Sequence, residues 1–281
     1  MGKCSGMLLL SDYDNTFCYT EKALSGSGEA APVNPRNLEA VRYWMAEGGR
    51  FAVATGRALA AFRRQAAGVP MNAPAIVDNG GAIYDFAQER YLVKNFLPER
   101  ALFHIAALMD AFPTVSLELY HEDDLVQVMR PRAWNDQHAK LTGLGYEVIE
   151  AVTAETAPPP FAKALFVGEK ADLTALRDFI RAQSWSGDYE TIFSSDLLLE
   201  LTARGADKGT MALKLKELCG CEKLFCVGDH LNDLPMLAAA DRSFAPANAV
   251  PEVLASGAEV VCHCLKGAVG DAVERLERDL A

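Results

Sequence analysis

Short apolar runs alternate with amphipathic segments along the first part of the chain. Residues 7–10 are entirely apolar and predict a buried strand, and residues 51–54 predict a second one. Between them, residues 34–49 place apolar side chains on one face after the N-cap Asn34, which is typical of a helix. An alanine-rich helix and a third apolar run, within residues 73–85, follow. This βαβαβ order predicts a parallel sheet with helices on both faces.

The pattern changes at about residue 86. Residues 114–130 alternate apolar and polar positions around a central turn, as in a β-hairpin, and helices and further strands surround them. We therefore expect residues 86–192 to form a separate, smaller α+β domain. The first rhythm resumes at the segment "LLLELT". The expected fold is a Rossmann-like α/β core, residues 1–85 and 193–281, with an inserted cap domain.

The charge and composition of the chain exclude some classes of function. The net charge of −11 argues against nucleic-acid binding, because a binder needs a basic surface to neutralise phosphates. No apolar stretch reaches the roughly 18 to 20 residues that span a membrane, and residues 7–10 are too short for a signal peptide. We expect a cytoplasmic protein without a membrane partner and with seven reduced cysteines. No pattern indicates an oligomeric state.

Polar residues follow directly after the apolar runs. Ligands bind at the carboxyl ends of the strands in an open parallel sheet, so residues from different runs meet there. The residues at these positions are Asp12 and Asp14 after the first run, Thr55, Gly56 and Arg57 after the second, and Gly228, Asp229, Asn232 and Asp233 after a later one. Lys208 begins a predicted helix and can reach the same edge.

These residue types favour phosphoryl chemistry at a magnesium ion. Several carboxylates at one rim repel one another unless a cation lies among them, and hard oxygen ligands select Mg²⁺. Lys208 and Thr55 suit the oxygens of a phosphoryl group beside that ion. On an extended chain Asp12 and Asp14 project to the same side. We therefore expect Asp12 to attack phosphorus, forming an acyl phosphate, while Asp14 protonates the leaving alcohol and later takes a proton from water.

Four ordered motifs resemble those of the haloacid dehalogenase (HAD) superfamily, in its Cof-type branch with an α/β cap inserted after the second motif. The motifs are "DYDNT" at residues 12–16, "ATGR" with Thr55, "ADKGTMALKL" with Lys208, and "GDHLND" with Asp229, Asn232 and Asp233. Two further segments, "VDNGGAIYD" and "APANAVPEVLASGAEVV", also resemble this branch. The resemblance therefore covers the whole chain.

The resemblance implies a Mg²⁺-dependent phosphatase that acts on a small phosphorylated metabolite such as a sugar phosphate. It implies Asp12 as nucleophile and metal ligand, and Asp14 as acid/base whose backbone carbonyl also binds the metal. Asp229 would be a metal ligand and Asp233 an outer or alternative one. The implied phosphate-binding residues are Thr55, Gly56, Arg57, Lys208 and Asn232.

Two positions depart from the family pattern. Asn15 replaces the usual glycine, but asparagine tolerates the left-handed conformation, so we expect the turn to form. His230 stands where the branch usually has a small residue. We favour a solvent-facing loop histidine here, and the alternative is a contact with the substrate.

Three other functions use similar residues. A receiver-type phosphoacceptor has adjacent paired acids, whereas here the second acid is two residues away and a domain is inserted. A phosphosugar mutase would use the same Asp12 and Asp14, and the sequence leaves this function open. A non-catalytic binding protein is disfavoured, because the catalytic residues are intact.

Residues of the cap are expected to set the substrate specificity. The candidates are Tyr120, Arg130, Arg132, Trp134 and Lys163. A cationic or aromatic side chain there could hold a second phosphate, a carboxylate or a sugar face. For Tyr120 and Trp134 we favour packing within the cap.

Overall fold

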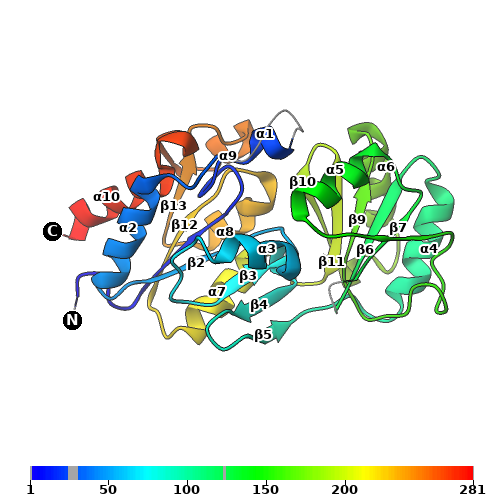
Figure 1. Cartoon of the computed structure of the whole chain (residues 1–281), viewed down its shortest axis with the longest axis horizontal. Helices are drawn as coiled ribbons and strands as arrows, with labels where there is room; N and C mark the ends of the chain where they lie inside the picture. The colour runs from blue at the N-terminus through cyan, green and yellow to red at the C-terminus, as the bar shows by residue number, and fades with distance from the viewer. Residues whose placement is uncertain (1, 25–30, 123–124, 281) are drawn as a thin grey trace.

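Two units lie side by side in the computed structural model, which describes residues 2–24, 31–122 and 125–280 (Figure 1). The first unit holds both ends of the described chain and a parallel sheet. The second holds a six-stranded, mostly antiparallel sheet. The expected α/β class with a parallel sheet is confirmed.

A five-stranded parallel sheet lies at the centre of the first unit. Its strand order is β14-β13-β12-β1-β2. The strands are β1 (Met7–Ser11), β2 (Arg50–Val53), β12 (Lys223–Val227), β13 (Arg242–Pro246) and β14 (Glu259–Val261). Because β1 lies between β2 and β12, strands from opposite ends of the sequence are hydrogen-bonded neighbours.

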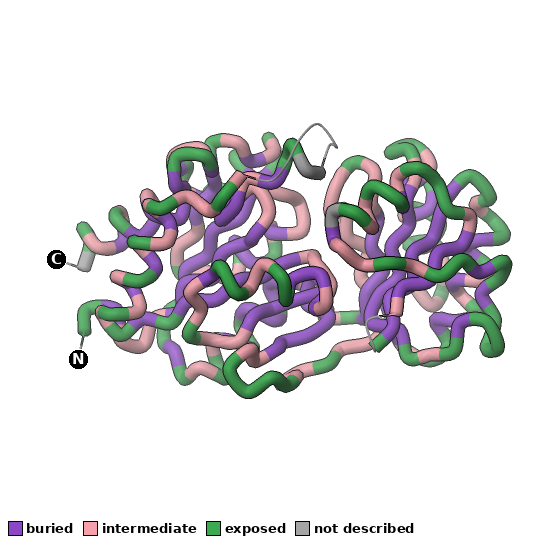
Figure 2. The backbone as a smooth tube through the Cα atoms, in the orientation of Figure 1, coloured by how far each residue is buried: buried purple, intermediate pink, exposed green. Residues whose placement is uncertain are grey.

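The opening aliphatic run supplies side chains to both faces of this sheet. Leu9 belongs to the apolar cluster that includes α2, α3 and α10, whereas Leu8 and Leu10 belong to the cluster that includes α7, α8 and α9. These helices are α2 (Pro35–Ala46), α3 (Leu59–Ala66), α7 (Lys208–Leu218), α8 (Leu234–Ala239), α9 (Pro251–Leu254) and α10 (Ala268–Leu280), with α1 (Glu21–Leu24) before them. Figure 2 shows the strands as the buried centre of each unit.

The third apolar run differs from the prediction of another parallel strand. Ile76 makes an isolated parallel bridge to Ala54, but the strand otherwise belongs to an antiparallel sheet of order β3-β4-β5. Its strands are β3 (Ala75–Val77), β4 (Ala82–Asp85) and β5 (Arg90–Lys94). Asn79 and Gly80 take positive φ angles of 54° and 99°. This tight turn reverses the chain, whereas a parallel partner needs a longer crossover.

The second unit is built on a sheet of order β10-β11-β9-β6-β7-β8. Its strands are β6 (Ser116–His121), β7 (Val126–Met129), β8 (Glu147–Ile149), β9 (Phe161–Val167), β10 (Tyr189–Ser195) and β11 (Leu198–Ala203). Helices α4 (Ala101–Ala111) and α6 (Lys170–Arg181) pack on one face with Leu117 and Leu119. Glu118 and Tyr120 alternate with these leucines, and Glu118 bonds residues of α5 (Ala133–Thr142).

The expected domain boundaries at residues 86 and 193 do not match this strand pairing. β5 pairs with β4 of the first unit, and β10 and β11 pair with each other in the second sheet. The segment "LLLELT" forms most of β11, which lies between β10 and β9 in the second sheet. As a central strand it is apolar, and it therefore resembles a strand of the first unit. We therefore propose boundaries near residues 95 and 204.

Three smaller features complete the fold. The short 3₁₀ helices are η1 (Asp78–Gly80), η2 (Ser186–Asp188), η3 (Leu231–Asp233) and η4 (Cys264–Lys266). None of the seven cysteines forms a disulfide. In the described part of the chain, none of the helices has the length and apolar character needed to cross a membrane.

Truncating Leu9 should destabilise the core. Leu9 is fully buried, so Leu9→Ala is expected to lower the free energy of unfolding by about 2–5 kcal/mol in urea titrations followed by circular dichroism. Leu213→Ala, the same change at a side chain that is 49% exposed on α7, should cost less than about 1 kcal/mol. Equal losses in the two variants would contradict this account of the core.

Candidate active site

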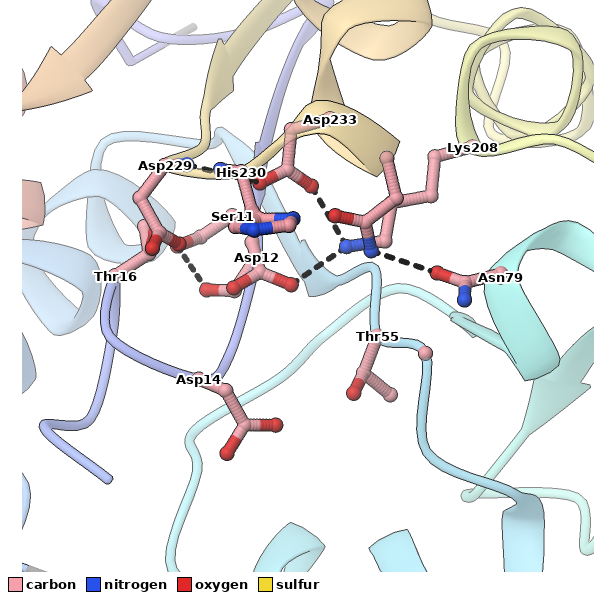
Figure 3. Close-up of polar contacts among 12 residues, drawn as sticks. Ser11, Asp12, Asp14, Thr16, Thr55, Asn79, Lys208, Asp229, His230 and Asp233 are labelled. Carbon is pink, nitrogen blue, oxygen red and sulfur yellow. Dashed lines mark hydrogen bonds and ion pairs between the residues drawn. The ribbon is translucent and has the colours of Figure 1, made fainter. Parts of the chain in front are cut away.

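The loops at the carboxyl ends of β1, β2 and β12 bring the expected site residues together (Figure 3). Asp12 follows β1, Thr55 follows β2, and Asp229 follows β12. Lys208 is the first residue of α7, whose N-cap Asp207 accepts hydrogen bonds from the backbone N–H groups of Gly209 and Thr210. The residues that also line the adjoining cleft are Asp12, Asp14, Gly56, Arg57, Asp229 and Asn232.

Lys208 links two of the acids. Its Nζ donates to Asp12 Oδ1 at 2.6 Å and to Asp233 Oδ1 at 2.7 Å. Burial alone would lower the pKa of Lys208, but the two carboxylates outweigh burial and raise it above its usual value. Lys208 is therefore a buried ammonium, held between a residue of the β1 loop and a residue of η3.

The second oxygen of Asp233 holds the loop after β12. Asp233 Oδ2 accepts hydrogen bonds from the backbone N–H groups of Asp229, at 2.8 Å, and His230, at 3.0 Å. A Cβ at Gly228 would lie 2.5 Å from the Cβ of Asp233, so the close approach requires glycine there. Thr16 Oγ1 donates to Asp229 Oδ1 at 2.7 Å. Asp233 therefore has a structural role in addition to its bond with Lys208.

Three buried carboxylates form a candidate cation site. One oxygen from each of Asp12, Asp229 and Asp233 lies within 4.8 Å of the others. Burial, and after it the negative charge of Asp233, raises the pKa of Asp229 to about 8. Burial also raises the pKa of Asp12, although the positive charge of Lys208 opposes this shift. One ammonium does not balance three carboxylates, so a divalent cation fits this place. An all-oxygen ligand set suits Mg²⁺.

Asp14 lies apart from this acidic cluster. β1 ends at Ser11. Asp12 still donates its backbone N–H to the carbonyl of Val227 at 2.9 Å, whereas Asp14 forms an isolated bridge with Cys18, so the two acids do not share one extended strand as we expected. Arg57 donates two hydrogen bonds to the Asp14 carboxylate, from Nε at 2.8 Å and from Nη2 at 2.7 Å. Thr20 Oγ1 donates a third at 2.7 Å. Burial opposes the charge of Asp14, but Arg57 and Thr20 outweigh burial and lower its pKa. Asp14 is therefore ionised in this arrangement.

Arg57 also differs from the expectation. Its guanidinium, expected on a phosphate, instead pairs with Asp14, because a planar fork matches a carboxylate in two parallel hydrogen bonds. Its buried Nη1 has no hydrogen-bond partner among the described residues. Arg57 thus keeps the two N–H donors of Nη1 for a further group.

The turn after Asp12 forms with asparagine in place of glycine, as expected. Asn15 has a φ of 58°, in the left-handed region. Its Oδ1 accepts from the backbone N–H of Thr20 at 3.0 Å, and its carbonyl oxygen accepts from Asn248 Nδ2 at 2.9 Å. Asn248 lies in the "APANA" segment, so that segment supports the loop after β1.

Thr55 and Asn232 lie beside the acids. Thr55 is fully buried, and its Oγ1 accepts from the backbone N–H of Arg57 at 3.1 Å. Asn232 Nδ2 donates to Asn79 Oδ1 at 2.8 Å. Asn79 was not among the expected site residues. The "VDNGG" segment was the available signal, but the position of Asn79 in the site depends on its positive φ within the tight turn of η1.

One wall of the cleft comes from the second unit. Tyr120 and Lys163 line it, as two of the candidates for specificity. The residues of this wall that the sequence did not indicate are His138, Thr142, Leu165, Ser194, Leu198 and Glu200. We call these residues, with Tyr120 and Lys163, the cap wall.

The other three candidates lie elsewhere. Arg130 Nη1 donates to the backbone carbonyls of Met109, at 2.7 Å, and Phe112, so this arginine is used inside the cap. Arg132 is exposed at the start of α5, and Trp134 packs in the apolar cluster of the cap. None of these three residues lines the cleft.

His230 lies in the cleft, which contradicts the favoured solvent-facing interpretation. It lines the cleft beside Asp229, and its buried Nδ1 has no hydrogen-bond partner among the residues that the structure describes. Burial lowers the pKa of His230, so the imidazole is neutral at pH 7. The alternative, a residue placed to contact the substrate, now has the better support.

The family of the protein follows from a comparison with known families. A family model of haloacid dehalogenase-like hydrolases matches residues 9–273. The chain therefore belongs to the haloacid dehalogenase-like hydrolases. This confirms the resemblance seen in the four motifs, and with it the expected enzyme class, a phosphoric monoester hydrolase.

Individual proteins that are similar to this chain belong to the same class of enzyme. The HMP-PP phosphatase of Cronobacter sakazakii is 26% identical over 232 residues, which are 79% of this chain and 81% of the relative. The structure of a sugar phosphatase of HAD subclass IIB matches 96% of this chain and 99% of its own, with a TM-score of 0.79 and 17% identity. A HAD-superfamily phosphatase of Bacteroides thetaiotaomicron matches 98% and 96%, with a TM-score of 0.80 and 18% identity. The two structures share the fold of this chain.

Removing Arg57 should leave the partly buried carboxylate of Asp14 without its cation. Arg57→Met is expected to raise the pKa of Asp14 and to lower the free energy of unfolding by about 1–3 kcal/mol at pH 7. The deficit should shrink as the pH falls below the raised pKa, because the variant's Asp14 then becomes neutral. Urea titrations at several pH values measure both effects.

The matched control is the double variant Arg57→Met with Asp14→Asn. It removes both charges, so it should be clearly more stable at pH 7 than Arg57→Met alone. If the double variant is instead as unstable as the sum of the two single changes, the pair does not hold Asp14 in the way described.

Proposed function

We propose that this protein is a Mg²⁺-dependent phosphatase that releases phosphate from small phosphorylated metabolites, sugar phosphates in particular, through an aspartyl phosphate on Asp12. The observation that carries the proposal is the position of Asp12, which contacts the Lys208 ammonium and belongs to the carboxylate cluster with Asp229 and Asp233. The functions of two relatives, an HMP-PP phosphatase and a sugar phosphatase, support small phosphorylated metabolites as the class of substrate, and the second supports sugar phosphates.

The carboxylates suit a magnesium ion. Asp12, Asp229 and Asp233 would hold Mg²⁺, joined by the backbone carbonyl of Asp14, and HAD hydrolases generally use this ion. Bound there, Mg²⁺ would neutralise negative charge on the acids and on the phosphoryl oxygens. Lys208, Thr55 and Asn232 would donate hydrogen bonds to the same oxygens.

In the first step, a carboxylate oxygen of Asp12 attacks phosphorus. The bond from phosphorus to the ester oxygen breaks, and the leaving alkoxide takes a proton from Asp14. In the second step, Asp14 removes a proton from a water molecule, whose oxygen attacks phosphorus and restores the Asp12 carboxylate. Phosphate and the alcohol are the products.

The ion pair of Asp14 with Arg57 bears on the first of these steps. An ionised Asp14 is ready to act as a base, but it must hold a proton before it can act as an acid. We infer that Arg57 leaves Asp14 when the substrate binds and that its guanidinium then meets the phosphate. The unpartnered Nη1 of Arg57 and its place in the cleft support this inference.

The two aspartates should respond differently to substitution. Asp12→Asn is expected to abolish phosphate release, because it removes the nucleophile, and Asp14→Asn is expected to slow release by about 10²- to 10⁴-fold. The assay measures free phosphate from a panel of sugar phosphates with Mg²⁺, and circular dichroism checks folding. Normal turnover by folded Asp12→Asn would refute the mechanism.

The same assay separates a phosphatase from a phosphosugar mutase. A phosphatase releases free phosphate without a bisphosphate activator, whereas a mutase returns the phosphoryl group to another hydroxyl. Accumulation of an isomeric sugar phosphate with little free phosphate would favour the mutase.

The carboxylate cluster should govern metal binding. Asp229→Asn is expected to weaken Mg²⁺ binding by at least about tenfold in calorimetric titrations, because it replaces one charged ligand with a neutral one. Excess chelator should stop turnover by the unmodified enzyme, and added Mg²⁺ should restore it. Asp241→Asn, at an acid that binds Lys223 away from the cleft, is the matched control and should bind Mg²⁺ normally. Equal affinities in both variants would contradict the proposed ligand set.

A further inference from the structure

The cap wall contains a cation, Lys163, whose ammonium already has partners within the protein. Lys163 is only 3% exposed although it lines the cleft. Its Nζ donates to Glu200 Oε2 at 3.0 Å and to the backbone carbonyl of Gly56 at 2.8 Å, and lies 4.9 Å from the centre of the Tyr120 ring. An ammonium has three N–H donors, and these three contacts use them.

Glu200 cancels the charge of this lysine. Glu200 is also 3% exposed and lines the cleft, so any ligand near Lys163 is also near a carboxylate. Burial opposes the charge of Lys163, but the carboxylate of Glu200, with those of Asp78 and Glu118, outweighs burial and raises the pKa of Lys163 above its usual value. The pair therefore carries one positive and one negative charge and has no net charge.

The histidine of the cap wall is also bound to a carboxylate. His138 Nδ1 lies 2.7 Å from Glu118 Oε2. Glu118 is held in turn by Tyr120, whose hydroxyl donates at 2.8 Å, and by Asn135, whose Nδ2 donates at 2.9 Å. With Nδ1 taken, His138 has Nε2 left to hydrogen-bond a ligand, and that nitrogen has no partner among the described residues.

The cap wall thus offers hydrogen bonds without an uncompensated cation. His138, Thr142 and Ser194 provide polar atoms, and Leu165 and Leu198 provide apolar surface. A phosphate or carboxylate on the far side of the substrate would meet Glu200, and Glu118 behind His138, with no free positive charge to receive it. Such a group would lose its hydration without gaining a cation.

We propose that the cap wall selects phosphate monoesters whose leaving group carries no negative charge, and that Glu200 enforces this choice by neutralising Lys163. The proposal rests on the phosphatase function above and specifies the leaving group that the enzyme accepts. A neutral, hydroxyl-bearing or amide-bearing leaving group fits the wall. This proposal excludes the alternative in which Lys163 binds a second phosphate or a carboxylate of the substrate.

Two aryl phosphates that differ by one charge test the proposal. 4-Carbamoylphenyl phosphate and 4-carboxyphenyl phosphate are close in shape, but the second has an anionic leaving group. The unmodified enzyme with Mg²⁺ is expected to favour the carbamoyl compound by about tenfold or more in kcat/KM, mainly through KM. Equal values, or a preference for the carboxylate, would overturn the proposal.

Two variants of the pair should move this preference in opposite directions. Glu200→Gln frees the charge of Lys163, so the preference for the neutral compound should fall several-fold or reverse. Lys163→Met leaves Glu200 uncompensated, so the preference should rise. General damage to the cap would lower kcat/KM for both compounds together, and the ratio between them would stay the same.

A charge change away from the cleft is the control. Glu147→Gln removes one carboxylate from an exposed position on β8 of the same unit and should leave the ratio unchanged. If the ratio stays constant in both Glu200→Gln and Lys163→Met, the pair does not select the leaving group. Absence of phosphate release both from these compounds and from the panel of sugar phosphates would overturn the phosphatase function and, with it, this inference, whereas equal release from the two aryl phosphates would overturn the inference alone.

Discussion

The contact of Lys208 with Asp12 and Asp233 is the interaction on which the site depends. The three side chains come from the β1 loop, the start of α7 and the 3₁₀ helix after β12, and all three are buried. Without the ammonium, two carboxylates would face each other out of water, at a cost that burial makes large. The parallel sheet can therefore bring these acids together because α7 delivers a cation to the same edge.

The same principle recurs at two further places around the cleft. Arg57 holds Asp14 in the first unit, and Lys163 holds Glu200 in the second. Each pair lies close to where the substrate would bind. Lys163 and Glu200 are almost fully buried, and the Asp14 side chain is 24% exposed beside the nearly buried Arg57. Charges in such surroundings interact strongly, so the cleft is organised by paired charges before a ligand arrives. The exception is the acidic cluster, where the carboxylates outnumber the ammonium.

Much of this arrangement could be predicted from the sequence, because it depends on local patterns. The run at residues 7–10 became a central strand, and the acids after it reached the sheet edge, since both follow from apolar periodicity and parallel topology. The cap was harder to predict. "LLLELT" could not be assigned to a sheet from its composition, because a central antiparallel strand and a core strand are equally apolar. Glu200 and His138 escaped notice because their partners depend on strand register and helix position, which leave no local signal.

The division of the parallel sheet has a consequence for how the protein is made. Asp12 and Lys208 are 196 residues apart, and β1 pairs with β12, so neither the sheet nor the charge contact can form until the ribosome has released both segments. The cap sheet, in contrast, comes from one continuous stretch between β6 and β11. During translation β1 can pair with β2 and the cap can fold, but the edge of β1 that binds β12 stays unpaired until β12 is made, and such an edge is open to aggregation.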